Sequence, residues 1–174
     1  KLFFDLCPCP IIGVTGTKGK GTTSTLIYQM LKQTGKDAYL GGNIGLPPLT
    51  FLEKLTDSSV VVLELSSFQL HDLTQSPHIA VILMTVLEHM DYHEDMSEYV
   101  DAKRNIVRFQ SSGDYAILNK DYVASNESDV YTDGEVYVVS RERSTVEQGC
   151  YIKDNVIWVL RGGSERKIVD VSEI

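Results

Sequence analysis

The sequence predicts an α/β fold: a parallel sheet flanked by helices, with a small antiparallel β layer near the C-terminus. Three observations predict it. Through the first two thirds of the chain, apolar runs of strand length alternate with segments of helical periodicity. A glycine-rich loop joins the first apolar run to the first helical segment. Beyond about residue 125, short alternating runs separated by Asp-Gly, Asp-Asn and Gly-Gly favour antiparallel hairpins.

Apolar runs supply the strands of the predicted parallel sheet. Each is rich in Val, Ile or Leu and is bounded by polar or glycine-rich residues, as expected for strands that are buried on both faces. The predicted strands span residues 11–15, 38–40, 60–65, 79–84 and 115–118.

Helices are predicted between these strands, where apolar residues recur every three or four positions. Residues 26–31 carry this pattern, and Gly35 ends the helix. Residues 49–55 predict a short helix. Residues 96–109 predict a longer one, in which Tyr99 and Lys103 lie on the same face because they are four positions apart.

Composition places the chain among ordinary globular domains. Its 174 residues are 43% hydrophobic and 23% charged, which is enough for one domain with a sizeable core. The net charge of -8 argues against a nucleic-acid partner, because affinity for phosphate backbones comes mainly from clustered Lys and Arg. No apolar run approaches the roughly 20 residues that span a bilayer, so we expect no membrane partner.

The ends and the cysteines of the chain carry two further expectations. Cys7, Cys9 and Cys150 show no metal-type spacing, and we interpret them as reduced thiols of a cytoplasmic protein, which we expect to be monomeric. The chain begins at Lys1 rather than Met and opens with the apolar stretch KLFFDL. We therefore expect residues 1–174 to form a single domain of a longer protein.

The loop GVTGTKGKGTTST has the composition of a phosphate-binding loop. Its glycines let backbone N–H groups converge on an anion at a helix N-terminus, and Lys20 adds a mobile positive charge. The hydroxyl groups of Thr22 and Thr23 are placed to reach Mg2+. The residues expected to contact a nucleotide are Gly16, Thr17, Lys18, Gly19, Lys20, Gly21, Thr22 and Thr23.

This loop departs from the regular Walker A pattern in two positions. Val14 stands where the pattern requires a glycine, and Gly21 stands where it has Ser or Thr. The alternative interpretation is a glycine-rich turn with a surface lysine. The strand before the loop, the helix after it and the Gly-Lys pair followed by two threonines favour a P-loop-type nucleotide site.

Glu64 ends the apolar run VVLE, where an unpaired carboxylate would cost several kcal/mol if buried. Ligands collect at the carboxyl ends of the strands in an open parallel sheet, and this strand is expected beside the strand that precedes the phosphate loop. The sequence therefore predicts Mg2+ on a nucleotide as the partner of Glu64.

A second cluster of metal-type ligands follows the predicted strand at 79–84. Histidines flanked by carboxylates at the carboxyl end of a strand suit a second divalent cation, although such loops are also common on solvated surfaces. The cluster comprises Glu88, His89, Asp91, His93, Glu94 and Asp95.

Five motifs in order give the chain a resemblance to a known family. TGTKGKGTT, GGNIGLP, ELSSFQL, EHMDYH with the following YVDAK, and ILNKD together resemble the central ATPase domain of the Mur ligases, over about residues 10 to 120. ELSSFQL is particularly similar to the members that add D-glutamate. The strand-rich tail agrees with the family only in kind.

The resemblance implies roles for individual residues. Lys20 would hold the β- and γ-phosphates, Glu64 would ligate Mg2+, and His89 would lie near a second metal ion. Lys103 matches the family lysine that is carbamylated and thereby becomes a metal ligand; the alternative is an ordinary exposed lysine. The family pattern also places Asn43 near the triphosphate, Asn119 on the adenine side, and Ser66 and Ser67 toward the substrate. Thr22 would have to supply the metal-binding hydroxyl that Gly21 lacks, and the family commonly has Asp at Glu88 and Asn at Thr85.

The implied activity is ATP-dependent addition of D-glutamate to UDP-N-acetylmuramoyl-L-alanine, through an acyl phosphate, in peptidoglycan precursor synthesis. ATP and Mg2+ are the implied cofactors. The family's N-terminal UDP-binding domain and its C-terminal domain are expected to lie outside residues 1–174, so the isolated domain is expected to be inactive as a ligase. Two alternatives remain open: a folylpolyglutamate synthetase-like ligase, and a nucleotide-binding module without ligase chemistry.

Overall fold

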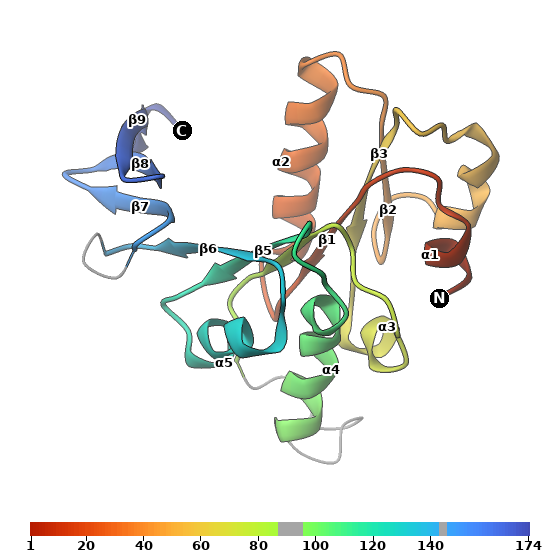
Figure 1. Cartoon of the computed structure of the whole chain (residues 1–174). Coiled ribbons are helices and arrows are strands. Elements are labelled where there is room, and N and C mark those ends of the chain that lie inside the picture. The colour runs from red at the N-terminus through yellow and green to blue at the C-terminus, as the bar shows by residue number, and fades with distance from the viewer. Residues whose placement is uncertain (87–95, 143–145) are drawn as a thin grey trace.

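The computed structural model describes residues 1–86, 96–142 and 146–174. Within these residues a single sheet has the strand order β2-β3-β1-β4-β5-β6-β7-β8-β9 (Figure 1). Neighbouring strands from β2 to β7 run parallel, and the β7–β8 and β8–β9 pairs are antiparallel. The strands are β1 Ile11–Thr15, β2 Ala38–Gly42, β3 Val60–Glu64, β4 Ile79–Ile82, β5 Tyr115–Asn119, β6 Glu135–Ser140, β7 Gly149–Lys153, β8 Val156–Arg161 and β9 Ser164–Asp170.

Helices connect the parallel strands, as the sequence predicts. The predicted stretch at 49–55 forms two short 3-10 turns rather than one helix. The helices are α1 Leu2–Leu6, α2 Lys20–Gln33, α3 Ser67–His71, α4 Met96–Arg108 and α5 Val123–Asn126, and the 3-10 turns span Pro48–Thr50, Leu52–Lys54, Glu127–Tyr131 and Val171–Glu173.

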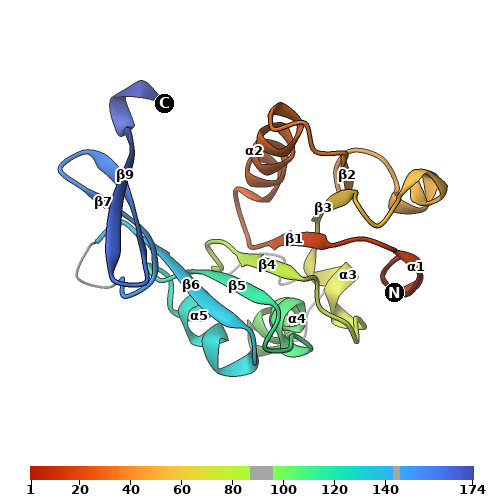
Figure 2. The same cartoon turned by 45° about the horizontal axis from the view of Figure 1, so that its top comes forward.

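The sheet is covered on both faces in its parallel part. Helix α2 lies on one face of the sheet (Figures 1 and 2). Its residues Ile27 and Leu31 pack against strand residues such as Val14. Helices α3 and α4 lie on the other face and contribute Leu70 and Ile106 to the larger core cluster. Burial on both faces explains why these strands are continuous apolar runs.

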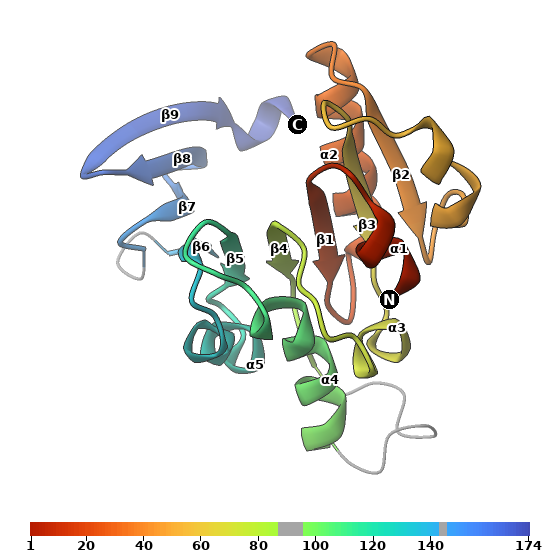
Figure 3. The same cartoon turned by 45° about the vertical axis from the view of Figure 1, so that its right-hand side comes forward.

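One part of the predicted topology is wrong. The sequence predicts antiparallel strands beyond about residue 125, but β6, which contains the run EVYVV at 135–139, pairs in parallel with β5 and also in parallel with β7. A crossover through α5 and the turn Glu127–Tyr131 separates β5 from β6 and allows the parallel pairing. The antiparallel part begins only at β7 and continues the same sheet, away from the helices (Figure 3).

Cys7, Cys9 and Cys150 are free thiols in the structure. Cys7 and Cys9 lie just before β1, with their sulfur atoms 3.7 Å apart. Burial, followed by the hydrogen bond with Cys7, raises the pKa of the Cys9 thiol to about 12, so this thiol stays protonated at neutral pH. Among the described residues, no helix has both the length and the apolar composition of a membrane span.

Asp114 is expected to make folding stability depend on pH at the end of the sheet opposite the phosphate loop. Partial burial raises the pKa of its carboxyl group, but hydrogen bonds from Ser111 and His78 outweigh burial and leave the pKa below its ordinary value. A lowered pKa in the folded state means that this stabilisation is present above the unfolded pKa of about 3.9 and is lost as the pH falls.

We therefore expect the Asp114→Asn variant to lose less stability than the unaltered protein when the pH is lowered from 6 to 3. The loss is measured as the shift in the midpoint of urea denaturation. Asp57→Asn, at an exposed position, serves as the control and should leave that difference unchanged. Equal pH dependence in Asp114→Asn and the unaltered protein would contradict the prediction.

Candidate nucleotide and cation site

The phosphate loop follows β1 and ends at Gly19, the N-cap of α2. Gly19 has a φ of 85°, a left-handed conformation that favours glycine, and this lets the chain turn sharply into the helix. The loop is anchored to the chain beyond β4 by the Thr17 N–H, which donates to the Met84 carbonyl at 2.7 Å. The first N–H groups of α2 thus lie at the carboxyl end of the sheet, where phosphate binds in such folds.

Thr17 connects the loop to two neighbouring segments. Its hydroxyl group donates to the Val86 carbonyl at 2.9 Å and accepts from the Val86 N–H at 3.0 Å. The same oxygen lies 3.2 Å from the hydroxyl group of Tyr99 on α4. Thr17 is only 7% exposed, and its buried side chain holds the loop against these two segments.

Two lysines meet at one carbonyl oxygen of the loop. Lys20 Nζ donates to the carbonyls of Gly16 and Thr17, each at 3.0 Å, so this side chain folds back over its own loop. Lys103 Nζ donates to the same Gly16 carbonyl at 3.1 Å and lies 4.4 Å from the centre of the Tyr99 ring. Lys103 is 3% exposed, which excludes an ordinary surface lysine.

Glu64 is buried at the end of β3, as the sequence predicts, with an exposed fraction of 4%. One oxygen, Oε1, accepts a 3.2 Å hydrogen bond from the side-chain amide of Asn43. The other, Oε2, is buried and has no hydrogen-bond partner among the described residues. The dipole of α2 offers at most about 2 kcal/mol to a nearby carboxylate, less than a buried unpaired charge costs, so this oxygen fits a cation.

The first turn of α2 presents glycine, rather than a hydroxyl group, to this carboxylate. A Cβ atom at Gly21 would lie 3.2 Å from Glu64 Oε2. Lys18 and Thr22 are exposed, and Thr23 is half-buried and donates its N–H to the Gly19 carbonyl. The structure therefore brings Gly21, and not Thr22, against Glu64.

Asn43 is placed by the glycine-rich turn after β2. Its backbone N–H donates to the Glu64 carbonyl at 2.9 Å, in addition to the side-chain contact with Glu64 Oε1. Gly42, just before it, has a φ of 102°, and a Cβ atom there would come within 2.2 Å of the Glu64 carbonyl oxygen. Asn43 therefore orients Glu64 at the edge of the site.

The two serines predicted to face substrate have different environments. Ser66 is the N-cap of α3: its hydroxyl accepts from the Gln69 N–H, and the Gln69 side chain accepts from the Ser66 N–H, which completes a capping box. Ser67 is 3% exposed in the first turn of α3. The spacing Ser-x-x-Gln is a known helix-start signal that sequence reasoning could have used at this position.

The predicted second cation cluster, with Glu88, His89, Asp91, His93, Glu94 and Asp95, lies outside the described residues. Within the described parts of the chain, no group of three or more His, Cys, Asp and Glu side chains is arranged to hold a metal ion. Thr85 is buried and its hydroxyl donates to the Leu83 carbonyl at 3.3 Å. The roles assigned to His89 and its neighbours stay predictions.

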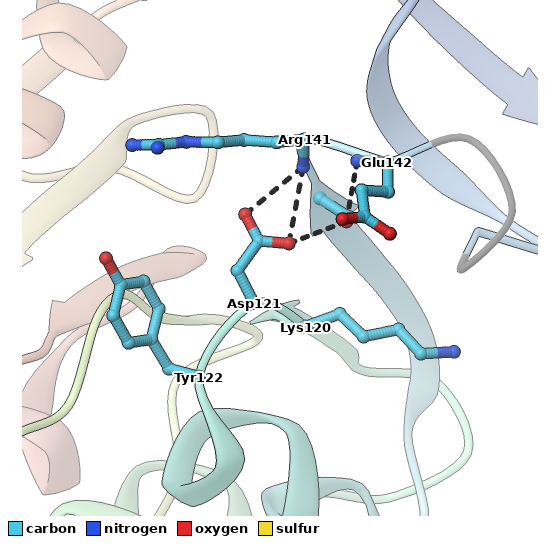
Figure 4. Close-up of a pocket in the computed structure, with 6 residues that line it drawn as sticks. Lys120, Asp121, Tyr122, Arg141 and Glu142 are labelled. Carbon is cyan, nitrogen blue, oxygen red and sulfur yellow. Dashed lines mark hydrogen bonds between the residues drawn. The ribbon is translucent and has the colours of Figure 1, made fainter.

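A cavity of about 460 Å³ lies at the carboxyl ends of β5 and β6. Asn119 accepts from the Asp121 N–H at 3.0 Å, and the Asp121 carboxylate accepts from the Ser140 hydroxyl and the Arg141 N–H. Figure 4 shows Tyr122 and Arg141 extending to one side of Asp121 and Lys120 to the other. Sequence reasoning missed Tyr122 and Arg141. Tyr122 lies in the loop after β5, and Arg141 directly follows the last residue of β6.

The parallel sheet, the loop entering α2 and the buried carboxylate beside it define a P-loop-type α/β domain. A family model described as "Mur ligase middle domain" matches residues 14–155. This chain belongs to that family.

Curated relatives agree with the resemblance seen in the sequence. The chain is 45% identical over 174 residues to a "UDP-N-acetylmuramoylalanine--D-glutamate ligase" of Acetivibrio thermocellus, covering 100% of this chain and 37% of the relative. It is 43% identical over 175 residues to the protein of the same name from Symbiobacterium thermophilum, covering 99% and 38%. The predicted similarity to the D-glutamate-adding members is confirmed, and the chain spans less than half the length of these relatives.

Solved structures support the fold. MurF ligase from Thermotoga maritima in complex with ADP matches with a TM-score of 0.65 and 20% identity, over 96% of this chain and 42% of that one. E. coli FolC in complex with DHPP and ADP matches with a TM-score of 0.64 and 17% identity, over 94% and 49%. The common fold therefore includes both Mur ligase and FolC chains.

Proposed function

We propose that this chain is the ATP-binding domain of a ligase that adds D-glutamate to UDP-N-acetylmuramoyl-L-alanine in the cytoplasm. The observation that carries the proposal is the buried Glu64 Oε2, which has no hydrogen-bond partner among the residues that the structure describes and lies beside a P-loop-type loop. Relatives with 45% and 43% identity that bear the name of this ligase support the choice of reaction. The remaining length of those relatives supports assigning the UDP-binding and C-terminal domains to other parts of the protein.

Phosphate binding uses the residues already gathered at the loop. Lys20 turns from the Gly16 and Thr17 carbonyls to the β- and γ-phosphates, while the first N–H groups of α2 donate to the phosphate oxygens. Glu64 holds Mg2+ through Oε2, with Asn43 fixing the other oxygen. When bound, Mg2+ offsets negative charge on the phosphoryl oxygens.

The nucleoside end of ATP is assigned to the cavity at β5 and β6. Strands lie about 4.8 Å apart, so the end of β5 is about 10 Å from the end of β1, and this suits the length of a nucleotide. Tyr122 offers a ring for stacking and Arg141 a planar cation. Asn119 is placed on the adenine side, although its side-chain oxygen is engaged by the Asp121 N–H in this structure.

The reaction proceeds in two steps. The substrate carboxylate attacks the γ-phosphoryl group, which gives an acyl phosphate and ADP. The amine of D-glutamate then attacks the acyl carbon, the amide bond forms with loss of a proton, and phosphate leaves. Lys20 stabilises the charge that moves through the phosphoryl group in the first step.

Further residues are assigned by family resemblance. We propose carbamylated Lys103 and His89 as ligands of a second Mg2+, and Ser66 and Ser67 on the substrate side. The burial of Lys103 against the phosphate loop supports its place in the site. We also propose that the protein acts as a monomer.

A folylpolyglutamate synthetase-like ligase is the second candidate. Gly21 favours it, because the resemblance to that family includes a Gly after the loop lysine, and E. coli FolC in complex with DHPP and ADP has a similar fold. The two candidates share the ATP site and differ in the substrate that accepts the phosphoryl group. ELSSFQL and the identities of the curated relatives favour the D-glutamate ligase.

Calorimetric titration with a non-hydrolysable ATP analogue and Mg2+ tests the proposed ATP site. We expect saturable binding, and Lys20→Ala is expected to weaken it at least tenfold because a charge-assisted phosphate contact is lost. Lys36→Ala, an exposed lysine beyond the other end of α2, should bind as the unaltered domain does. Equal loss in both variants would show that general positive charge, and not the loop, attracts the nucleotide.

A further inference from the structure

Two thiols lie in contact where the chain enters the sheet. The Sγ atoms of Cys7 and Cys9 are 3.7 Å apart, in the segment between α1 and β1. This segment leads into the amino end of β1, whereas the phosphate loop at Gly16 follows the carboxyl end of the same strand. The thiol pair is therefore separate from the proposed ATP site and from the cation site at Glu64.

The two thiols differ in their access to solvent. Cys7 is half-buried and lies between the exposed residues Leu6 and Pro8, so solvent reaches its side of the pair. Cys9 is 9% exposed and belongs to the larger core cluster. A reagent that enters from solvent therefore meets Cys7 first, and Cys9 is positioned to form a second bond to the same reagent.

The distance between the sulfur atoms matches two bonds to one bridging atom. Two bonds of about 2.3 Å, the usual metal–thiolate length, that meet at a tetrahedral angle place their sulfur atoms about 3.8 Å apart. A disulfide requires about 2.05 Å, so the sulfur atoms would have to move about 1.7 Å closer across a ring that contains Pro8, whose φ is fixed. The geometry therefore favours chelation over oxidation to a disulfide.

The number of available ligands decides which thiophilic species suits the pair. A structural Zn2+ site takes four protein ligands. Across residues 1–86, 96–142 and 146–174, however, no three or more His, Cys, Asp and Glu side chains are arranged to hold a metal ion. A trivalent arsenical with one organic group needs only two sulfur atoms, because carbon occupies its third bond. Two thiols without a further ligand suit the arsenical.

We propose that Cys7 and Cys9 form a chelating site for trivalent arsenicals that carry one organic group. Phenylarsine oxide, which is a dihydroxide in water, represents this class. Each As–S bond forms as an As–O bond breaks, the thiol proton goes to the departing hydroxyl group, and two waters leave while arsenic stays trivalent. Burial, the largest cause, raises the pKa of the Cys9 thiol to about 12, so this thiol still carries the proton that the second step uses.

Intact-mass spectrometry of the reduced protein, treated with phenylarsine oxide, tests the inference without nucleotide or ligase activity. We expect an adduct that survives excess glutathione but is removed by dimercaptopropanol, because a ligand held by two bonds is displaced only by another chelator. Cys7→Ala and Cys9→Ala should each lose the glutathione-resistant adduct. Cys150→Ala, which removes the free thiol on β7, should retain it.

Thermal unfolding distinguishes a site of the folded chain from two cysteines that are merely close in sequence. We expect the arsenical to raise the melting temperature of the unaltered protein and of Cys150→Ala, since a ligand that prefers the folded state stabilises it. The melting temperature of Cys7→Ala should not rise. Because Cys7 is half-buried, this variant is expected to fold, and its cooperative transition without the arsenical checks that it does.

The outcomes separate the inference from the proposed function. Loss of the glutathione-resistant adduct in Cys150→Ala, or its retention in Cys7→Ala, would overturn the inference. An unchanged or lower melting temperature of the unaltered protein with its adduct would also overturn it, because the folded chain would then not hold the sulfur atoms at a chelating distance. Failure of the untreated protein to bind the ATP analogue would overturn the proposed function and leave the thiol site standing.

Discussion

Replacement of Gly42 by Ala is expected to destabilise the domain by more than about 3 kcal/mol. The φ of 102° is a conformation that costs an alanine about 1–2 kcal/mol. The added methyl group would also lie 2.2 Å from the Glu64 carbonyl oxygen and 3.0 Å from the Glu64 nitrogen. Relief requires β2 to move away from β3, which breaks the pairing between Gly42 and Glu64.

Two other glycines serve as controls that separate the cost of backbone strain from the cost of steric crowding. Gly35 has a φ of 79° but no described atom within 4 Å of a Cβ, so Gly35→Ala should cost about 1 kcal/mol. Gly113 has neither feature, and Gly113→Ala should change stability by less than about 1 kcal/mol. Urea denaturation measures all three, and equal costs at Gly42 and Gly35 would show that the close approach to Glu64 does not exist.

Thr17→Val is expected to lower the stability of the domain by about 2–4 kcal/mol and to weaken nucleotide binding. Valine keeps the shape of threonine, but the Val86 carbonyl, the Val86 N–H and the Tyr99 hydroxyl all lose their contact with the Thr17 oxygen. Leaving buried polar groups unpaired costs about 1–3 kcal/mol each, and solvent reaches part of Val86.

Thr34→Val makes the same chemical change at an exposed position. The Thr34 hydroxyl donates only to the Leu31 carbonyl in the last turn of α2, and water can replace it. We expect a loss below about 1 kcal/mol in chemical denaturation. If Thr17→Val and Thr34→Val cost the same, the Thr17 hydroxyl does not join the loop to the segment after β4 and to α4.

Much of the fold follows from local sequence pattern. The strands at Ile11–Thr15, Val60–Glu64 and Ile79–Ile82 are predictable because burial on both faces demands continuous apolar residues. The direction of β6 is not predictable in this way, since EVYVV has the same local pattern in either orientation. Only its pairing with β5 and β7 decides the direction, and pairing is a property of the whole chain.

The apolar stripe of α2 shows the same limit. Ile27 and Leu31 pack against the sheet as predicted, but Leu26 and Met30, which share the periodic pattern, are 53% and 64% exposed. Periodicity identifies a helix and its approximate apolar side. It does not specify which apolar residues reach the core.

In the candidate site, too, some positions could be predicted from the sequence and others depend on tertiary packing. The positions of Lys20 and Glu64 follow from a loop and a strand end that the sequence marks clearly. The burial of Lys103 against Gly16 is consistent with its place on the Tyr99 face, but the contact itself depends on how α4 packs. The role of Thr22 as a metal ligand stays a prediction, and the residue of α2 that lies against Glu64 is Gly21, because the rotation of α2 relative to β3 is fixed only by tertiary packing.

The two hydrogen bonds of Lys20 within its own loop have a consequence for measured affinity. Phosphate must replace the Gly16 and Thr17 carbonyls as the acceptors of this ammonium group. Binding therefore exchanges carbonyl acceptors for phosphate acceptors without adding hydrogen bonds to Lys20. The observed binding free energy reports the difference between the lysine–phosphate and the lysine–carbonyl hydrogen bonds. A nucleotide dissociation constant will understate the strength of the lysine–phosphate contact itself, because the loop carbonyls compete with phosphate for the Lys20 ammonium group.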